Sequence, residues 1–166
     1  EYANDVCNYL MKNGVESIDY VIATHPHSDH CGGLTQVIET FSCDNFITVE
    51  TEQQSKVWLN VLYAVNNENV NYIDAKVGET YSFGNSSFEI MGPYSEKYDN
   101  YNDYSVVVKA TYKNSSFLFT GDAEKNAELE MLENGADLKA DVLKAGHHGS
   151  STSNCREFLN AVSPSY

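Results

Sequence analysis

The stretch "ATHPHSDHCGG", residues 23–33, places His25, His27, Asp29 and His30 within six consecutive positions. The run before it, "IDYVIAT", is β-branched and aromatic, which is typical of one buried strand. The cluster therefore follows directly from the end of a strand. Three neutral imidazoles and a carboxylate crowded together have no apolar rationale. The pattern predicts a metal site rather than a piece of hydrophobic core.

The spacing of these side chains suits two metal ions. Residues i and i+2 of an extended backbone point to the same side, so His25 and His27 can bind one cation. Asp29 and His30, beyond the turn, can face a second. Imidazole nitrogen and carboxylate oxygen with no obligatory thiolate favour zinc, with manganese or iron as alternatives.

Two later stretches can complete such a site. In "SSFLFTGDAE", residues 115–124, an apolar strand runs into Gly121 and Asp122, and this carboxylate could bridge both cations. In "ADVLKAGHHGSSTS", residues 140–153, a strand and a glycine precede His147 and His148, followed by a hydroxyl-rich turn. One histidine of this pair is expected to be a ligand.

The coarse organisation is a β-α-β-α rhythm followed by short segments that predict consecutive antiparallel strands from about residue 70. Helices are expected over 1–14, 34–41, 51–69, 124–133 and 154–162, and strands over 18–24, 45–50, 70–74, 80–84, 86–92, 104–112, 115–122 and 140–146. The polar, tyrosine-rich tract 92–104 is either a lid over a site or an ordinary surface loop.

Composition fits one domain over residues 1–166, with 42% hydrophobic residues to fill its core. The formal net charge of -14 disfavours nucleic acid as a partner, because such binding usually needs a stripe of Lys and Arg. No apolar run is long enough to predict a membrane segment. The four cysteines lack C-x-x-C spacing, so we expect buried thiols rather than a zinc ribbon.

The motifs "THPHSDHCGGL", "FLFTGDAE" and "LKAGHHGS", in this order, resemble the metallo-β-lactamase fold. They are most similar to the branch that contains the hydrolase domain of the DNA-uptake protein ComEC and the phosphorylcholine esterases. The resemblance runs from about Ile18 to the end of the chain. It implies an α/β (α+β) fold, an αββα sandwich with a dinuclear site at one edge of its two sheets. It also gives a weak preference for a location outside the cytoplasm.

For the site, the resemblance implies six metal ligands: His25, His27, Asp29, His30, Asp122 and His147. The first two would bind the first metal, the next two and His147 the second, and Asp122 would bridge them. His148 becomes a candidate for contacting the substrate. The sequence leaves open whether His147 and His148 exchange these roles.

Two departures from the family pattern matter. True β-lactamases and glyoxalase II have a further first-metal histidine, and this chain has none between residues 31 and 121, which argues against those activities. The ComEC-like branch instead shows an Asn-rich stretch, echoed by "NDYSVVV", where Asn102 or Asp103 could approach the first metal or a substrate oxygen. The family's outermost strands have no counterpart here, so we expect a domain truncated at both ends.

These features predict a dinuclear metallohydrolase with two zinc ions that cleaves a phosphodiester, either phosphorylcholine-type or nucleic acid. Two such cations can hold a hydroxide between them as the nucleophile, and Asp29 would orient it. Its partner would be a small-molecule or phosphodiester substrate. The alternative is a non-catalytic metal-binding or regulatory module that keeps the ligands without turnover.

Overall fold

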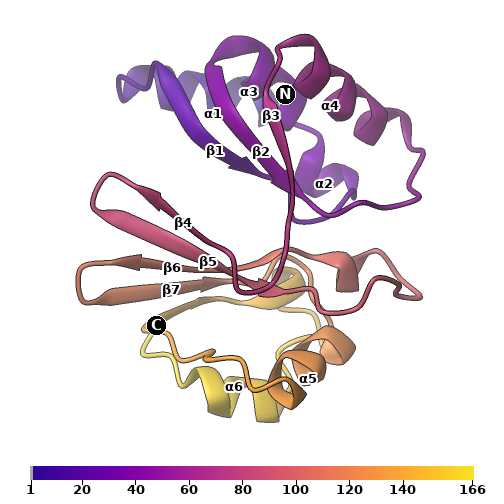
Figure 1. Cartoon of the computed structure of the whole chain (residues 1–166), viewed down its shortest axis with the longest axis vertical. Coiled ribbons are helices and arrows are strands. Elements are labelled where there is room, and N and C mark those ends of the chain that lie inside the picture. The colour runs from indigo at the N-terminus through magenta and orange to yellow at the C-terminus, as the bar shows by residue number, and fades with distance from the viewer. Residues whose placement is uncertain (1) are drawn as a thin grey trace. The chain divides into compact units, whose positions relative to one another are not determined.

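The computed structural model of the chain describes residues 2–166. It divides into two compact units, Glu1–Asp74 (unit 1) and Ala75–Tyr166 (unit 2). Each unit has a sheet of its own with helices beside it (Figure 1). The predicted mixed α/β class with two sheets is therefore confirmed. Among the described residues, no helix combines the length and the apolar character needed to cross a membrane.

Unit 1 is a three-stranded parallel sheet in the order β1-β2-β3. Its elements are α1 (Tyr2–Lys12), β1 (Ser17–Ile22), α2 (Ser28–Cys31), α3 (Leu34–Thr40), β2 (Ser42–Thr48), α4 (Lys56–Asn67) and β3 (Asn71–Asp74). The core joins the buried side of the sheet to the apolar faces of α3 and α4, with Phe46, Ile38 and Val61 almost fully buried.

Two sequence predictions for unit 1 need correction. Strand β3 was expected to be antiparallel, but it pairs with β2 in parallel, because α4 carries the chain back to the start of the sheet between them. The helix expected from residue 51 begins at Lys56, where the Ser55 hydroxyl accepts the backbone N–H of Trp58 at 3.2 Å and caps it.

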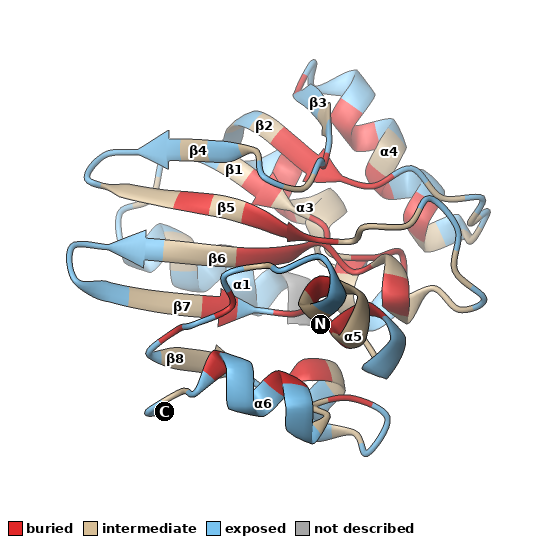
Figure 2. Ribbon diagram, turned by 60° about the horizontal axis from the view of Figure 1, so that its bottom comes forward, coloured by how far each residue is buried: buried red, intermediate tan, exposed pale blue. Residues whose placement is uncertain are grey.

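Unit 2 is a five-stranded sheet in the order β4-β5-β6-β7-β8, antiparallel except for the last pair. Its elements are β4 (Thr80–Phe83), β5 (Ser86–Gly92), the 3-10 helix η1 (Asn102–Tyr104), β6 (Val107–Tyr112), β7 (Ser115–Phe119), α5 (Lys125–Glu133), β8 (Val142–Lys144), η2 (Gly146–Gly149) and α6 (Arg156–Val162). Burial is concentrated in the parts of β5 and β6 nearest the 92–104 loop that joins them (Figure 2).

The topology of each unit places candidate residues at strand ends. In unit 1 the histidine segment follows β1. In unit 2 Asp122 follows β7, and η2 follows β8, which is parallel to β7 because α5 connects them. Carboxyl ends of parallel neighbours meet at one sheet edge, which brings Asp122 and η2 together.

Candidate metal-binding residues

The segment after β1 is fixed by continued pairing with β2. The backbone N–H of Ala23 donates to the carbonyl of Ile47 at 2.9 Å, and the Thr48 hydroxyl donates to the carbonyl of Ala23 at 2.9 Å. Because both bonds tie residue 23 to the sheet, the direction in which the chain leaves the strand is set before the first histidine.

The three histidines of unit 1 lie against one another. His25 is fully buried, and its Nε2 lies 3.1 Å from Nδ1 of His27. The ring centroid of His25 is 4.7 Å from that of His27 and 4.3 Å from that of His30. The other nitrogen of His25, Nδ1, lies 3.1 Å from the Thr24 hydroxyl, which fixes the plane of the ring. Histidines that bind metals commonly make such a hydrogen bond through their other ring nitrogen, which fixes the orientation of the imidazole.

Asp29 and His30 lie on the single turn α2. A carboxylate oxygen of Asp29 is 3.5 Å from Nε2 of His30. Gly32 makes the turn possible: a Cβ at that position would stand 2.4 Å from the carbonyl oxygen of Ser28, which accepts the Gly32 N–H at 2.8 Å. These four side chains thus lie near one another within unit 1, and their roles as ligands of two metals stay a prediction.

Cys31 faces away from this group into the core. It is fully buried, and its thiol donates to the carbonyl of Pro26 at 3.5 Å. Burial raises the pKa of Cys31 to about 11, so it stays a protonated thiol at neutral pH. The expectation of mostly buried cysteines holds for Cys7 and Cys31, whereas Cys43 and Cys155 are half-buried.

In unit 2, Asp122 is the centre of a second group. Its side chain is 3% exposed, and one carboxylate oxygen lies 3.8 Å from Nε2 of His147 and 3.5 Å from Nε2 of His148. Its backbone N–H donates to the hydroxyl of Ser105 at 3.0 Å, which anchors the turn after β7 to η1. Unit 2 thus gathers its three predicted residues, all presenting the atoms that bind metals.

The backbone at η2 is unusual. His147 (φ 48°, ψ 52°) and His148 (φ 52°, ψ 25°) are both left-handed, which costs a non-glycine residue on the order of 1 kcal/mol. Gly146 beside them packs closely, since a Cβ there would meet the Thr120 hydroxyl at 3.2 Å. The Asn154 side chain holds Gly146 from both sides, accepting its N–H at 2.9 Å and donating to its carbonyl at 3.0 Å. Strain maintained this firmly is typical of functional sites.

Glu124 holds His147 from the side opposite Asp122. Its Oε1 lies 3.2 Å from Nδ1 of His147 and accepts the Thr152 hydroxyl at 3.1 Å and the Asn102 side-chain amide at 2.9 Å. The Thr152 oxygen itself is 3.2 Å from the same Nδ1. Sequence reasoning missed Glu124 and Thr152. The available signal was their position, two residues after Asp122 and inside the hydroxyl-rich turn after the histidine pair.

Asn102 and Asp103 support Glu124. The Asn102 side-chain amide donates to Glu124, as described above. In addition, the backbone N–H of Glu124 donates to Asp103 Oδ1 at 2.9 Å, and the Asn100 side chain donates to the carboxylates of both Asp103 and Glu124. Burial raises the pKa of Asp103 above its usual value, an effect that these hydrogen bonds only partly offset. A direct contact of Asn102 or Asp103 with a metal or substrate stays a prediction.

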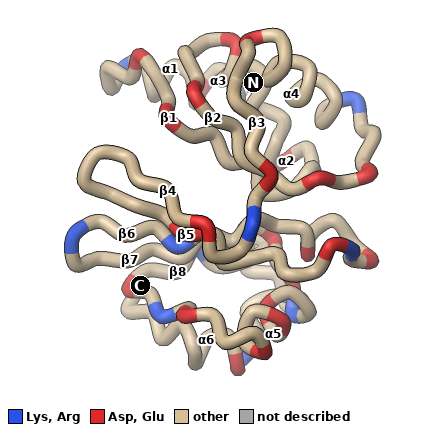
Figure 3. Tube along the Cα trace, in the orientation of Figure 1, with Lys and Arg blue, Asp and Glu red and all other residues tan. Residues whose placement is uncertain are grey.

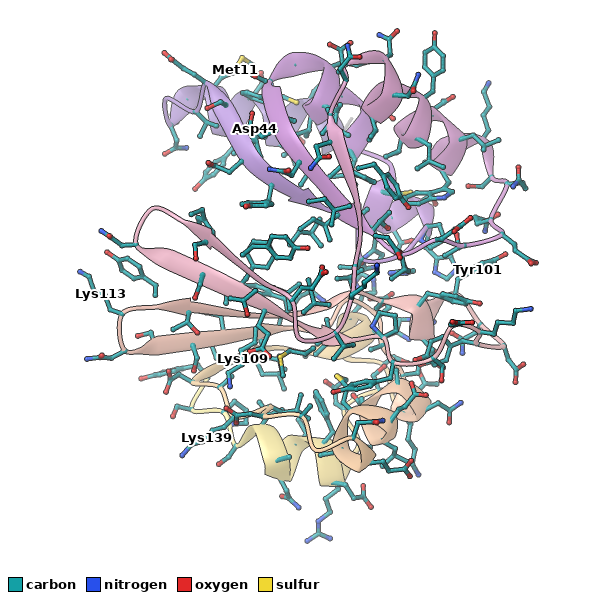
Figure 4. All side chains as sticks on the ribbon, in the orientation of Figure 1. Met11, Asp44, Tyr101, Lys109, Lys113 and Lys139 are labelled. Atoms are coloured by element: carbon teal, nitrogen blue, oxygen red, sulfur yellow. The ribbon has the colours of Figure 1, made fainter. Side chains whose placement is uncertain are left out.

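The 92–104 tract is held at its base. The hydroxyls of Ser95 and Tyr98 donate to Glu130 of α5, and the Tyr104 hydroxyl accepts the N–H of Tyr98 at 3.2 Å. Tyr101, at the end of the tract before η1, is labelled in Figure 4 and is only partly buried. A tract with this many partners is an ordered loop of unit 2, and a lid role stays a prediction.

The sequence of the chain is similar to those of known proteins. The chain is 28% identical over 156 residues to ComE operon protein 3 of Bacillus subtilis, covering 94% of this chain and 20% of that protein. It is 29% identical over 158 residues to competence protein ComA of Neisseria gonorrhoeae, covering 95% and 20%. The chain thus spans about a fifth of these curated relatives.

A solved structure shows the same fold. CmlA of Streptomyces venezuelae, described as a diiron beta-hydroxylase, matches with a TM-score of 0.59 at 15% identity over 90% of this chain and 34% of that chain. The model of one family, the metallo-beta-lactamase superfamily, matches residues 8–166. That match covers nearly the whole chain, including every candidate ligand in both units. The chain belongs to the metallo-beta-lactamase superfamily.

Proposed function

We propose that the candidate ligands of this chain hold two divalent metal ions, and that the protein is a metal-dependent phosphodiester hydrolase. The observation that carries the proposal is the buried Asp122 carboxylate with Nε2 of both His147 and His148 within 3.8 Å. Two imidazoles turned toward a buried carboxylate form a donor set suited to a divalent cation. His25, His27, Asp29 and His30 supply matching donors in unit 1.

Bound divalent cations would lower the pKa of water and polarise a phosphoryl oxygen. The residues of the chain have distinct tasks around that chemistry. Asp29, 61% exposed, is placed to accept a hydrogen bond from attacking water and to direct it. His148, 60% exposed, is accessible to a substrate, whereas His147, 28% exposed, is the less accessible of the two. These exposures support the roles that the family resemblance suggested.

Glu124 is the residue that makes His147 a ligand. The Thr152 hydroxyl, which also lies beside the imidazole, can donate its proton to Glu124. Glu124 can only accept. Glu124 beside Nδ1 therefore favours the proton there, which would leave the lone pair of Nε2 directed toward Asp122 for a metal. Glu124 is thus a positioning residue rather than a catalytic one.

Two observations bear on the substrate class, and they favour different phosphodiesters. The resemblance to the DNA-uptake branch of the family, together with the relative named competence protein ComA, favours a nucleic-acid phosphodiester. The net charge of -14 favours a small phosphodiester over a long polyanion. Zinc suits the donor set, and iron and manganese are the alternatives, iron being the metal of the diiron neighbour CmlA.

The test uses the whole chain, stripped with a chelator and then reconstituted separately with zinc, manganese and iron. Metal content is measured by elemental analysis, and turnover with bis(4-nitrophenyl) phosphate and with single-stranded DNA. We expect two metals per chain and chelator-sensitive turnover in the wild type, both reduced in Asp122→Asn but not in Asp137→Asn, an exposed aspartate of the same unit. Metal without turnover would favour the non-catalytic module, and failure to bind metal would overturn both functions.

A further inference from the structure

Unit 1 contains a cavity that the metal-binding residues do not use. Its volume is about 430 Å³, and it is lined by residues 49–51, by Trp58 and Leu62 of α4, and by Tyr72 and Asp74 of β3. Residues 49–51 follow β2 and Asp74 ends β3, so the cavity lies at the carboxyl ends of neighbouring parallel strands. This is the edge at which open α/β sheets commonly bind ligands.

The aromatic wall of the cavity is fixed by the core. The ring of the fully buried Phe46 lies 6.4 Å from Trp58 and 6.1 Å from Tyr72, measured between centroids. These contacts hold the buried Trp58 in place and restrain one side of Tyr72, which is 44% exposed. A preorganised aromatic surface lowers the entropic cost of binding and can attract a cation through its electron-rich faces.

The charged part of the wall is entirely acidic. Glu50 and Asp74 line the cavity, and the lining includes no Lys, Arg or His. The pKa of Tyr72 is raised first by burial and then by the negative charges of Asp74 and Glu50, so both carboxylates lie close enough to influence this phenol. Lys12 and Lys56 are the basic residues of unit 1, and acidic positions outnumber basic ones along its trace in Figure 3. Within the described residues, neither cavity carboxylate has a salt-bridge partner.

A polar oxygen in the wall also lacks a partner. The hydroxyl of Thr51 is buried and makes no hydrogen bond within the part of the chain that the structure describes. A buried hydroxyl without a partner is destabilising by about 1–3 kcal/mol, and a ligand or its hydration water would satisfy it. Thr51 is a lining residue of the same cavity, so this observation supports a ligand independently of the carboxylates.

The wall suits an organic cation better than a metal ion. Among the described residues, no third His, Cys, Asp or Glu joins Glu50 and Asp74 in a group of metal ligands. Two aromatic rings offer a metal nothing, whereas they match the diffuse charge and apolar surface of an alkylammonium group. We propose that this cavity binds an organic ammonium ion. The site lies wholly within unit 1 and does not depend on the proposed hydrolase function.

The experiment exploits Trp58, the single tryptophan of the chain. Its fluorescence in the whole metal-free protein is followed during titration with tetramethylammonium chloride at constant ionic strength, with tert-butanol as the uncharged probe of similar shape. We expect a saturable change with a dissociation constant on the order of 1 mM for the cation, and no saturation for the alcohol. An equal response to both probes, or none to the cation, would overturn the proposal.

Variants separate the two parts of the wall. Combining Glu50→Gln with Asp74→Asn should weaken binding about tenfold, whereas Glu52→Gln, an exposed neighbour outside the lining, should leave it unchanged. Tyr72→Leu should weaken binding about fivefold and Tyr72→Phe less than twofold, because phenylalanine keeps the ring. If calcium saturates the same fluorescence change and displaces the ammonium ion, the cavity is a metal site and the proposal is wrong.

Discussion

The two candidate ligand groups are built in opposite ways. In unit 1 the four candidate ligands come from six consecutive residues that follow one strand, and the three histidines among them contact one another directly. In unit 2 Asp122 and the two histidines come from segments separated by α5 and β8, and surrounding carboxylates, amides and hydroxyls hold them. The first group is a local motif, whereas the second is assembled by tertiary structure, and this difference predicts where each is sensitive to mutation.

The largest effect is expected at the centre of the assembled group. Asp122→Asn keeps the shape but removes the charge that the two imidazoles face. If the hydrolase proposal is right, turnover should fall on the order of 10³-fold and metal content should drop, because Lewis-acid stabilisation is worth several kcal/mol. Steady-state hydrolysis and elemental analysis measure the two effects. A variant with full metal and full activity would remove Asp122 from the site.

Next comes the support of His147. Glu124→Gln can offer its amide N–H as well as its oxygen to Nδ1, so the proton is no longer directed there. We expect metal affinity to fall by about 10–100-fold, as is usual when the carboxylate behind a ligating histidine is lost. Competition with a chromophoric chelator measures affinity, and nitrogen NMR of the metal-free protein shows which ring nitrogen of His147 carries the proton.

A second glutamate nearby in the sequence provides a matched control for Glu124→Gln. Glu130→Gln alters a glutamate of α5, the helix that Glu124 precedes, and this glutamate binds Ser95 and Tyr98 instead of a histidine. It should leave both metal affinity and the proton on Nδ1 unchanged. If it changed them as much as Glu124→Gln, a general disturbance of α5 would account for the result and the positioning role would be lost.

The unit 1 group could be predicted because its residues are close in sequence and their geometry follows from local backbone rules. The alternation of His25 and His27 and the turn through Gly32 require only the direction of a strand and a close backbone approach. The strand and helix pattern around it was mostly right for the same reason. The pairing direction of β3 was not, because it depends on the crossover made by α4 and not on the four residues of the strand.

The assembled group could be predicted only in part. Asp122, His147 and His148 were expected because they follow strands within motifs of the family, but their supports were missed. Glu124 reaches Asn102 and Thr152 across 22 and 28 residues of sequence. No spacing rule relates those positions, since the topology of β6, β7 and α5 brings them together. The left-handed backbone of His147 and His148 was equally invisible, because neither residue type requires it.

The hydrogen bonds that support the unit 2 group can be tested through the stability of the metal-free protein. Glu128 is fully buried, and its carboxylate accepts the backbone N–H groups of Asn154 and of Cys155, the latter at 2.8 Å. Asn154 in turn holds Gly146, next to His147. Glu128→Ala should lower the free energy of unfolding by about 3 kcal/mol, and Glu128→Gln by about 1 kcal/mol, because glutamine keeps one acceptor. Urea denaturation of the metal-free proteins measures this, and equal losses in both variants would argue against the hydrogen bonds as the cause.

The smallest effect concerns the outermost support, Asp103, and appears as a dependence on pH. Burial raises the pKa of Asp103 above its usual value of 3.8, so the folded state holds the proton more tightly than the unfolded state. Stability contributed by this group is therefore complete below that value and is lost as the pH rises through the raised pKa. Asp103→Asn cannot titrate. The stability of the wild type relative to this variant should thus decline as the pH rises above 3.8 and through the raised pKa, as urea denaturation at each pH would show. Parallel curves would mean that the donors from Glu124 and Asn100 balance the burial of the charge completely, and the support of the assembled group would then be insensitive to acid.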